Sequence, residues 1–493
     1  MRGYQGGINR VLLITIVVAM LGRLLMLGFY PLMDTTEARY AEIARKMLEL
    51  NDWVTPWFDY GVPFWGKPPL SFWLTAMSFK LFGINEFAAR LPHWLAGIVI
   101  AWLVWGMAGW RSRREAIFAV ALLVGSGLYF IASGAVMTDM IFAVGTTLAM
   151  RSFWLGLQGT EKERRCERWM LFVAIGIGLL AKGPLTLVLV MLPIVAWAVV
   201  TRNVGLVWRE FPWMRGALVS LAIALPWYVL AELHSPGFLN YFLVGEHFHR
   251  FVTPGWTGDL YGNAHQFAHG SIWIFALAAF LPWSLLLPAA VLYWRRKRDP
   301  SSQTNSDSRN WRLYMLFWGI APAVFFTFAG NILWTYLLPG APGLALWLAN
   351  HLTGQQNQKA VERLLLFGVV FTLLATLIFI LSLPVSGRSE RKSTKALISD
   401  FQSCRSSGEA LVFIDKVPYS GSFYSRGKAE HVDDIAELAQ RIKHETVFVA
   451  ILTNSVQNMP TSLMEDLTPI SRRGRFDLFR TNNHSAVPSS CIE

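Results

Sequence analysis

The chain has 493 residues, of which 54% are hydrophobic and 14% aromatic, and its mean hydropathy is +0.38. These values exclude an ordinary soluble globular protein, because apolar runs of about twenty residues, long enough to cross a bilayer as helices, recur up to residue 385. The net charge of +12 would suit nucleic-acid binding, but Lys and Arg cluster between the apolar runs, where they set membrane topology. We therefore expect a polytopic membrane protein embedded in a lipid bilayer, with no nucleic-acid partner.

The first apolar run, Val11–Tyr30, is longer than the core of a typical signal peptide and predicts a retained membrane helix. Arg2 and Arg10 precede this run, and positive charge favours the cytoplasmic side of a membrane. We therefore expect a cytoplasmic N-terminus and a long external first loop over residues 31–90.

The first loop opens with an amphipathic pattern. Apolar side chains recur at helical spacing and charged side chains take the other face, the apolar set being Tyr40, Ile43, Ala44, Met47 and Leu48 and the charged set Arg39, Glu42, Lys46 and Glu49. This pattern predicts a helix that lies in the plane of the membrane interface. Asp34 and Glu37 stand at its start, where two carboxylates serve either as a helix cap with its partner or as acid–base groups.

A lone lysine follows among aromatic residues in the same loop. Lys67 precedes Pro68 and Pro69, which forbid a helix through the lysine and hold it in a stiff turn. A cation fixed at a membrane surface predicts a site for an anionic lipid headgroup. The competing interpretation is that Lys67 keeps its alkyl chain in the membrane and extends its ammonium group to water.

Further apolar runs bring the expected total to about eleven membrane helices. They cover about 91–110, 116–133, 140–157, 169–181, the stretch to 200, 216–231, the stretch to 293, 311–328, 336–350 and 364–383. Basic segments at 111–114, 161–168 and 294–298 fall between runs on the side predicted to be cytoplasmic.

Charged residues also stand at the external ends of later spans. Asp139 lies at a membrane boundary, where an acid is a functional candidate, although it would also cap the helix that starts at Met140. Lys182 follows the fifth span, and a second external loop, 232–271, contains Glu246, His247 and Arg250. Carboxylates beside cations suit acid–base chemistry on a phosphate-bearing substrate. We expect these loops and the first loop to converge on one site.

Two histidine pairs are candidates for a divalent metal. His247 and His249 are two residues apart, and His265 and His269 are four apart, but the HExxH signature is absent. The sequence therefore favours histidines that face water in a loop, a divalent metal stays open as the alternative, and no other cofactor is expected. The three cysteines form no CxxC pair, so neither a zinc ribbon nor a disulfide framework is predicted, and a bridge between Cys404 and Cys491 stays open.

The composition changes after residue 385. We therefore divide the chain into a membrane domain, 1–385, and a small external α/β domain, 386–493. The periodicity predicts helices at Lys395–Cys404 and Val432–Ile442 and buried strands at Ala410–Ile414 and Thr446–Leu452.

Several motifs, in order, resemble the bacterial branch of the integral-membrane glycosyltransferases that use polyprenyl-phosphate sugars. This family includes the aminoarabinose–lipid A transferases and, more distantly, the protein O-mannosyltransferases. The motifs are DTTEARYAEIARKML from Asp34, GKPPL from Gly66, NEFAARLP from Asn85, TDM from Thr138, AKGP from Ala181, EHFHRF from Glu246 and TYLLP from Thr335.

The resemblance implies a C-type glycosyltransferase fold in the bacterial inner membrane, with a periplasmic site, a periplasmic C-terminal domain and an undecaprenyl-phosphate sugar as donor. Lipid A or another glycolipid is the expected acceptor, and protein hydroxyls come second. By motif match, Glu37 and Asp139 are the loop acids, and the expected phosphate-binding residues are Arg39, Lys67, Arg250 and Tyr336. Asp34 or Asp139 is expected to assist the acceptor, and the further candidates are Lys182, Glu246 and His247.

The chain departs from the family pattern at several positions. Thr36 stands where the family has its first-loop acid, Gly66 where it often has Glu, and Gly330 and Ile332 where it often has lysines. The loss at Thr36 supports a rival interpretation, in which the protein is a polyprenyl-lipid flippase or an envelope assembly scaffold without chemistry.

Overall fold

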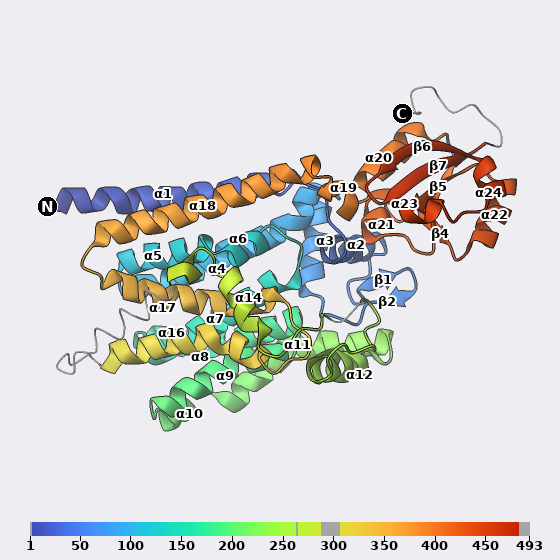
Figure 1. Ribbon diagram of the computed structural model, residues 1–493. Helices are drawn as coiled ribbons and strands as arrows, with labels where there is room; N and C mark the ends of the chain where they lie inside the picture. The colour runs from blue at the N-terminus through green and yellow to red at the C-terminus, as the bar shows by residue number, and fades with distance from the viewer. Residues whose placement is uncertain (1, 263–264, 287–305, 483–493) are drawn as a thin grey trace.

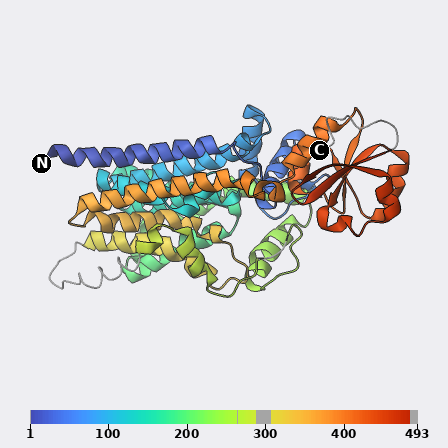
Figure 2. The same cartoon turned by 45° about the horizontal axis from the view of Figure 1, so that its top comes forward.

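The computed structural model describes residues 2–262, 265–286 and 306–482. A body of long helices carries a smaller α/β domain at one end, and the N-terminus lies at the opposite end (Figure 1). The long helices of the body are α1 (Arg2–Met26), α4 (Glu86–Gly109), α5 (Arg113–Val124), α7 (Thr138–Gln158), α8 (Glu161–Lys182), α9 (Leu185–Val200), α11 (Trp213–His234), α16 (Ser306–Phe326), α17 (Ala341–Thr353) and α18 (Gln358–Val385). Helices α1 and α18, far apart in the sequence, lie side by side in both views (Figures 1 and 2).

The helices fall where the sequence predicts membrane spans. In the described part of the chain, α4, α7, α11 and α18 are each long and apolar enough to cross a membrane, and α9 is a shorter apolar helix. The third expected span is divided into α5 and α6 (Gly127–Ala132), and the eighth begins with α14 (Ser271–Ala279) and ends among residues outside the described part. The prediction of a mainly helical protein is confirmed.

Large apolar side chains are exposed along the outer helices. Their positions are Val11, Ile14, Val18, Leu21 and Leu25 on α1, Leu218, Leu221, Leu225 and Val229 on α11, and Phe367, Phe371, Leu374 and Ile378 on α18. Soluble proteins rarely leave apolar stripes of this extent uncovered. These faces are suited to contact with lipid.

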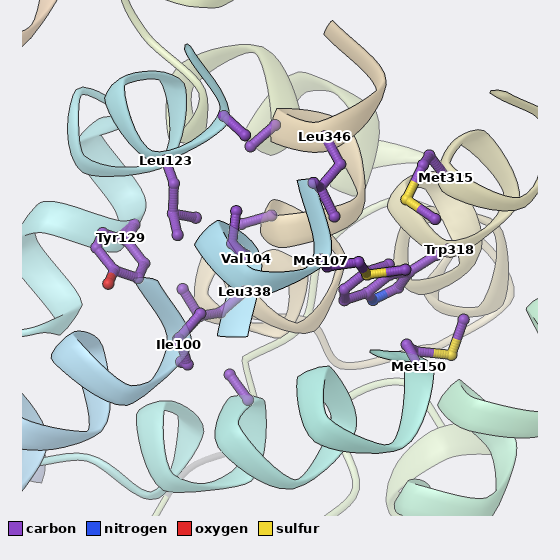
Figure 3. Close-up of a cluster of buried hydrophobic side chains, with 14 of the residues drawn as sticks. Ile100, Val104, Met107, Leu123, Tyr129, Met150, Met315, Trp318, Leu338 and Leu346 are labelled. Carbon is purple, nitrogen blue, oxygen red and sulfur yellow. The ribbon is translucent and has the colours of Figure 1, made fainter. Parts of the chain in front are cut away.

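The centre of the body is a close-packed apolar cluster (Figure 3). Ile100, Val104 and Met107 of α4 meet Trp318 of α16 and Leu346 of α17 there, all nearly or completely buried. The Trp318 indole N–H donates to the Pro339 carbonyl, so the polar atom of this ring is satisfied. This cluster joins helices from both halves of the membrane domain.

Glycines allow α7 and α8 to approach closely. A Cβ on Gly145 of α7 would lie 3.1 Å from the backbone of Gly178 of α8, and a Cβ on Gly178 would lie 2.3 Å from the Thr186 side chain. Small residues permit this approach in membrane helices, where packing rather than hydrophobicity drives association. Gly178 belongs to a GxGxxA-like stretch of the sequence and serves here as a packing residue.

The first loop forms a compact layer between the body and the C-terminal domain (Figure 1). It contains α2 (Thr36–Glu49), β1 (Trp57–Asp59), β2 (Val62–Pro63) and α3 (Leu70–Phe82). Both faces of α2 are covered, because Glu42, Arg45 and Lys46 are each 2% exposed. Arg45 pairs with Glu42 at 2.7 Å, and Lys46 pairs with Asp59 at 2.7 Å. Protein therefore covers most of the charged face that the sequence predicts for this helix.

The second loop, 232–271, contains α12 (Phe238–Asn240), the π-helix η1 (Tyr241–His249) and α13 (Arg250–Val252). The short 3-10 helices η2 (Trp283–Leu286) and η3 (Trp334–Gly340) lie further along the chain, and α10 (Val204–Glu210) precedes α11. Asn331 fastens the second loop to the turn before η3, because its amide donates to the carbonyls of Arg250 and Thr253.

The C-terminal domain is a five-stranded sheet with helices on both faces. Its elements are α19 (Arg388–Lys392), α20 (Lys395–Cys404), β3 (Ala410–Ile414), α21 (Tyr419–Ser425), β4 (Ala429–Val432), α22 (Ile435–His444), β5 (Val447–Leu452), α23 (Thr453–Val456), α24 (Thr461–Glu465), β6 (Leu467–Arg473) and β7 (Phe476–Thr481). The strand order is β4-β3-β5-β7-β6, with β3 parallel to β4 and β5, and with β7 antiparallel to its neighbours. Helix α20 packs on one face and α22 on the other.

Polar contacts join this domain to the first loop and to α4. Ser420, at the start of α21, donates its backbone N–H and its hydroxyl to the Asp34 carboxylate at 2.9 and 2.6 Å. Glu86, at the start of α4, accepts from Lys395 and Tyr424. The predicted option of a bridge between Cys404 and Cys491 involves a residue outside the described part of the chain.

A leucine at Gly145 is expected to force α7 and α8 apart and to destabilise the protein by about 1–3 kcal/mol, the usual cost of overpacking. The measurement is the midpoint of thermal unfolding in detergent. Gly106→Leu on α4 is the matched control, because a Cβ there has no neighbour within 4 Å. Equal midpoints for the two variants would show that the close approach of α7 and α8 does not limit stability.

Candidate active site

A polar cavity of about 420 Å³ lies where the first loop, 31–90, and the second loop, 232–271, meet the ends of α7 and α8. We call it the reaction cavity. Its charged and hydroxyl-bearing walls are Thr35, Thr36, Arg39, Tyr40, Lys67, Thr138, Asp139, Lys182, Glu246, Arg250, Asp259, Tyr261, His265, Thr335, Tyr336 and Tyr419. The predicted convergence of the first loop, Asp139 and the second loop is therefore seen in the structure.

An apolar groove of about 180 Å³ continues from this cavity. Lys67, Lys182, Glu246, Arg250 and Tyr336 line both spaces. The rest of the groove is mainly apolar, with Pro184, Leu185, Val188, Phe251, Phe325 and Phe326. The combined space is thus charged at one end and apolar at the other, with the cations at the junction.

Glu246 connects two of these cations. Its carboxylate lies 3.0 Å from the Lys67 ammonium and 3.0 Å from the Arg250 guanidinium, and Arg250 also pairs with Asp259 at 3.2 Å. Burial favours the neutral form of Glu246, but the charges of Lys67 and Arg250 hold its pKa below the usual range. Glu246 therefore stays ionised and keeps both cations in place.

Asp139 and Lys182 form the second charged pair. Asp139 lies in the first turn of α7 and Lys182 ends α8, so the close approach of these helices brings the two side chains into a hydrogen bond. The N-cap residue of α7 is Met137, and no side chain forms a capping hydrogen bond at this end of the helix. Asp139 therefore does not cap α7, which was the alternative interpretation of its position. The Lys182 ammonium also lies 4.8 Å from the centre of the Tyr336 ring.

Gly183 directs the chain away from Lys182. Its φ of +73° belongs to the left-handed region, and a Cβ there would lie 2.6 Å from the Phe242 ring. Glycine meets both requirements, because it adopts positive φ without strain and has no side chain.

Arg39 presents an unused donor. Its guanidinium donates to the Tyr261 carbonyl and lies over the rings of Tyr40 and Tyr419, at 5.2 and 5.7 Å. Its Nε is buried and makes no hydrogen bond in the described residues. A buried donor without a partner is costly. The Arg39 side chain also lines the reaction cavity and brings positive charge to it.

His247 faces the apolar groove. Its Nδ1 lies 2.7 Å from the Phe242 carbonyl oxygen and its Nε2 3.3 Å from the Lys182 carbonyl oxygen. Burial lowers the pKa of His247 below its usual value. The ring therefore positions the start of η1 against the end of α8.

Asp34 and Glu37 do not line the reaction cavity, which corrects the expected cluster. The Asp34 carboxylate points to α21, where Ser420 binds it, and burial raises its pKa although Ser420 opposes the shift. The Glu37 carboxylate accepts from the Arg90 guanidinium at 2.8 Å on each oxygen. Both acids are engaged by residues from later parts of the chain.

Arg90 makes Glu37 part of the scaffold. This arginine is completely buried and also donates to the carbonyls of Leu27, Tyr30 and Pro31. It thereby joins α4, α2 and the end of α1. Breaking a buried pair of this kind leaves a charge without a partner and usually destabilises a protein strongly.

Sequence reasoning did not select Asp259, Tyr261 and Asn331. Asp259 pairs with Arg250, and the Tyr261 hydroxyl bonds with the backbone of Pro63 and Trp65 next to Lys67. These residues lie outside the recognised motifs. The one indication in the sequence of a role at the site was that Asp259 belongs to the second loop, which contains other charged residues. Among the described residues, no group of three or more His, Cys, Asp or Glu side chains is arranged to hold a metal ion.

Comparison with known proteins identifies the family. Residues 10–242 match the family model described as dolichyl-phosphate-mannose-protein mannosyltransferase. An undecaprenyl phosphate-alpha-4-amino-4-deoxy-L-arabinose arabinosyl transferase from Erwinia tasmaniensis is 33% identical over 378 residues, which cover 74% of this chain and 64% of that protein. A protein of the same name from Aeromonas hydrophila is 31% identical over 390 residues, covering 75% and 66% of the two chains. The chain belongs to this family of membrane glycosyltransferases.

A solved structure of a family member has the same fold. ArnT from Cupriavidus metallidurans, bound to undecaprenyl phosphate, superposes with a TM-score of 0.81 at 20% identity, covering 97% of this chain and 99% of that one. The predicted polytopic fold with a small C-terminal domain is confirmed, and this glycosyltransferase family member is a multi-pass inner-membrane protein. The chain spans 64% and 57% of the lengths of its curated relatives from Erwinia tasmaniensis and Enterobacter.

The stability of this family member is expected to decrease as the pH falls below about 6.5, the usual pKa of histidine. Buried His247 has a lowered pKa, so the unfolded chain binds a proton at a higher pH than the folded chain does. Its stabilising contribution is complete above the unfolded pKa and is lost progressively as the pH falls toward the folded pKa. The check is the unfolding midpoint between pH 7.5 and 5. His247→Gln should show a shallower decrease than the wild type, and parallel curves would contradict this assignment.

Proposed function

We propose that this protein transfers a sugar from an undecaprenyl-phosphate donor to an envelope acceptor on the periplasmic face of the inner membrane. Lipid A or another glycolipid is the first candidate acceptor, and a protein hydroxyl is the second. One observation carries the proposal: Lys67, Lys182 and Arg250 stand where the polar reaction cavity meets an apolar groove. A lipid-linked phosphate has this combination of a charged group and an apolar chain.

The donor phosphate would lie at the junction of the two spaces. There Lys67, Lys182 and Arg250 supply positive charge, and Arg39 adds positive charge from the polar side. Tyr336 adds a hydroxyl at the same junction. The polyprenyl chain would leave along Leu185, Val188 and Phe325, which line the groove.

The bound donor changes the partners of the resident carboxylates. Each junction cation is paired with a carboxylate in the structure, Lys67 with Glu246, Arg250 with Glu246 and Asp259, and Lys182 with Asp139. When the phosphate takes over Lys182, the Asp139 carboxylate becomes free to accept a proton. Glu246, held by two cations, keeps Lys67 and Arg250 oriented.

Transfer then exchanges one carbon–oxygen bond for another. The acceptor oxygen attacks the anomeric carbon of the donor sugar as the bond from that carbon to the phosphate oxygen breaks. Asp139 takes the acceptor proton, and the electron pair of the broken bond remains on undecaprenyl phosphate, whose added charge the junction cations stabilise. Asp34 and Glu37 hold the scaffold and do not touch the substrates in this scheme.

The same proposal sets the topology. The N-terminus and α10 lie at the end of the body opposite the C-terminal domain (Figure 1). The basic segment 111–114 lies at the turn from α4 into α5, and 161–168 forms the first turns of α8; positive charge favours the cytoplasmic side. We place the N-terminus in the cytoplasm, and the first loop, 31–90, and the domain 386–493 in the periplasm, with residues 1–385 as the membrane domain.

The function is tested by mass spectrometry of polyprenyl-phosphate sugars in cells that lack this protein. One donor species should accumulate, and wild-type protein should remove it. Lys67→Ala should fail to remove it because the phosphate loses a cation, whereas the exposed Lys80→Ala should behave as wild type. An unchanged lipid pool in every strain, with the donor pathway shown to be active, would favour a flippase or scaffold.

Asp139→Asn is expected to reduce the transfer rate of the purified enzyme roughly 10²–10⁴-fold, the usual loss when a general base is removed. The assay follows release of undecaprenyl phosphate at saturating donor. Asp34→Asn is the matched control, because its carboxylate contacts Ser420 outside the reaction cavity. Full activity of Asp139→Asn would overturn its role as the base.

A further inference from the structure

A second polar cavity, of about 490 Å³, lies between the first loop and the C-terminal domain. We call it the interdomain cleft. The side chains that matter here are Phe58, Asp59 and Tyr60 on the first-loop wall and Asp415, Lys416 and His431 on the domain wall. No step of the proposed transfer uses these side chains.

The interdomain cleft adjoins the reaction cavity. Tyr419 lines both spaces, and its ring centre lies 5.7 Å from that of Phe58. The Phe58 ring in turn lies 4.9 Å from Tyr261, which also lines the reaction cavity. A thin aromatic wall therefore separates the two spaces, and a ligand in the cleft would lie beside the reacting groups.

The domain wall of the cleft follows the carboxyl ends of two parallel strands. Asp415 and Lys416 come directly after β3, and His431 belongs to β4. Asp415 has a φ of +72°, and its backbone N–H donates to the Val432 carbonyl at 2.8 Å, so the residue is fixed at the strand end. In open α/β sheets, ligands bind in crevices outside the carboxyl ends of strands.

Two charged side chains in this wall have no polar partner. Asp415 and Lys416 are exposed, and in the described residues neither side chain makes a hydrogen bond or an ion pair. The Lys416 ammonium lies 5.8 Å from the centre of the Phe58 ring and 5.4 Å from that of Tyr419. The opposite wall is already neutralised, because Lys46 pairs with Asp59.

We infer that the interdomain cleft binds a saccharide part of the acceptor that extends beyond the reacting hydroxyl group. The cleft offers flat aromatic surface for the C–H face of a sugar ring, together with hydrogen-bonding groups of both kinds for its hydroxyls. Acidic and basic side chains both line the cleft, so hydroxyl donors and acceptors of a sugar each find partners. This inference rests on the proposed transferase function, which supplies the acceptor.

The test measures binding without turnover. The full-length protein in detergent is equilibrated with the labelled, water-soluble oligosaccharide that de-acylation releases from rough lipopolysaccharide. The double variant Asp415→Asn/Lys416→Gln should weaken binding about tenfold, which equals the loss of one good interaction. Asparagine tolerates the left-handed backbone at this position, so the fold is retained. Lys428→Gln, an exposed change outside the cleft, should bind as the wild type does.

The outcomes separate this inference from the function on which it rests. Undecaprenyl-phosphate binding by the double variant should equal that of the wild type, which confirms an intact reaction cavity. The inference is overturned if the wild type does not bind the oligosaccharide. It is also overturned if the wild type and the double variant bind it equally well. Competition by a serine- and threonine-rich peptide, with no competition by other glycans, also overturns it in favour of a protein acceptor. Oligosaccharide binding by a wild type that transfers no sugar would leave the cleft assignment standing and remove the transferase function.

Discussion

The Glu246 carboxylate is the interaction on which the candidate site depends. Three cations crowd into a small space, and without carboxylates between them they would repel one another. Glu246 holds Lys67 from the first loop and Arg250 from the second, so one buried acid joins two segments that are far apart in the sequence. Asp139 does the same for Lys182. The site is thereby balanced in charge before a substrate enters, and in the proposed transfer an incoming phosphate would exchange with groups that are already oriented.

Backbone packing positions these charges. The glycine contact between α7 and α8 brings Asp139 to Lys182, and the Arg90–Glu37 pair fastens the first loop to α1 and α4. The residues of the first-loop motif thus divide into two tasks in the structure: Glu37 and Asp34 hold the scaffold, and Arg39 faces the cavity. A single motif in the sequence contributes to both stability and binding.

The C-terminal domain extends the polar surface available to a substrate. Ser420 and Tyr424 fasten α21 against the first loop and α4, so that the carboxyl ends of β3 and β4 face the membrane domain. Three neighbouring environments result: an apolar groove, a charged junction and, on the other side of an aromatic wall, a polar cleft. An amphipathic lipid and a polar acceptor can meet there without either leaving its preferred surroundings.

The sequence by itself determined the class of protein and most of its helices. Hydropathy located the membrane helices, and local periodicity predicted α20 and β3 at the observed bounds, because each pattern depends on neighbouring residues. Periodicity did not reveal β6 and β7, whose pairing with each other and with β5 depends on partners outside the local pattern. Tertiary structure alone decided which carboxylate meets which cation: Asp34 and Glu37 matched the expected site by motif but pair with Ser420 and Arg90, whereas Asp259 joins Arg250 without any motif. A charged side chain carries no local signal of its partner, since that choice is made when distant segments pack.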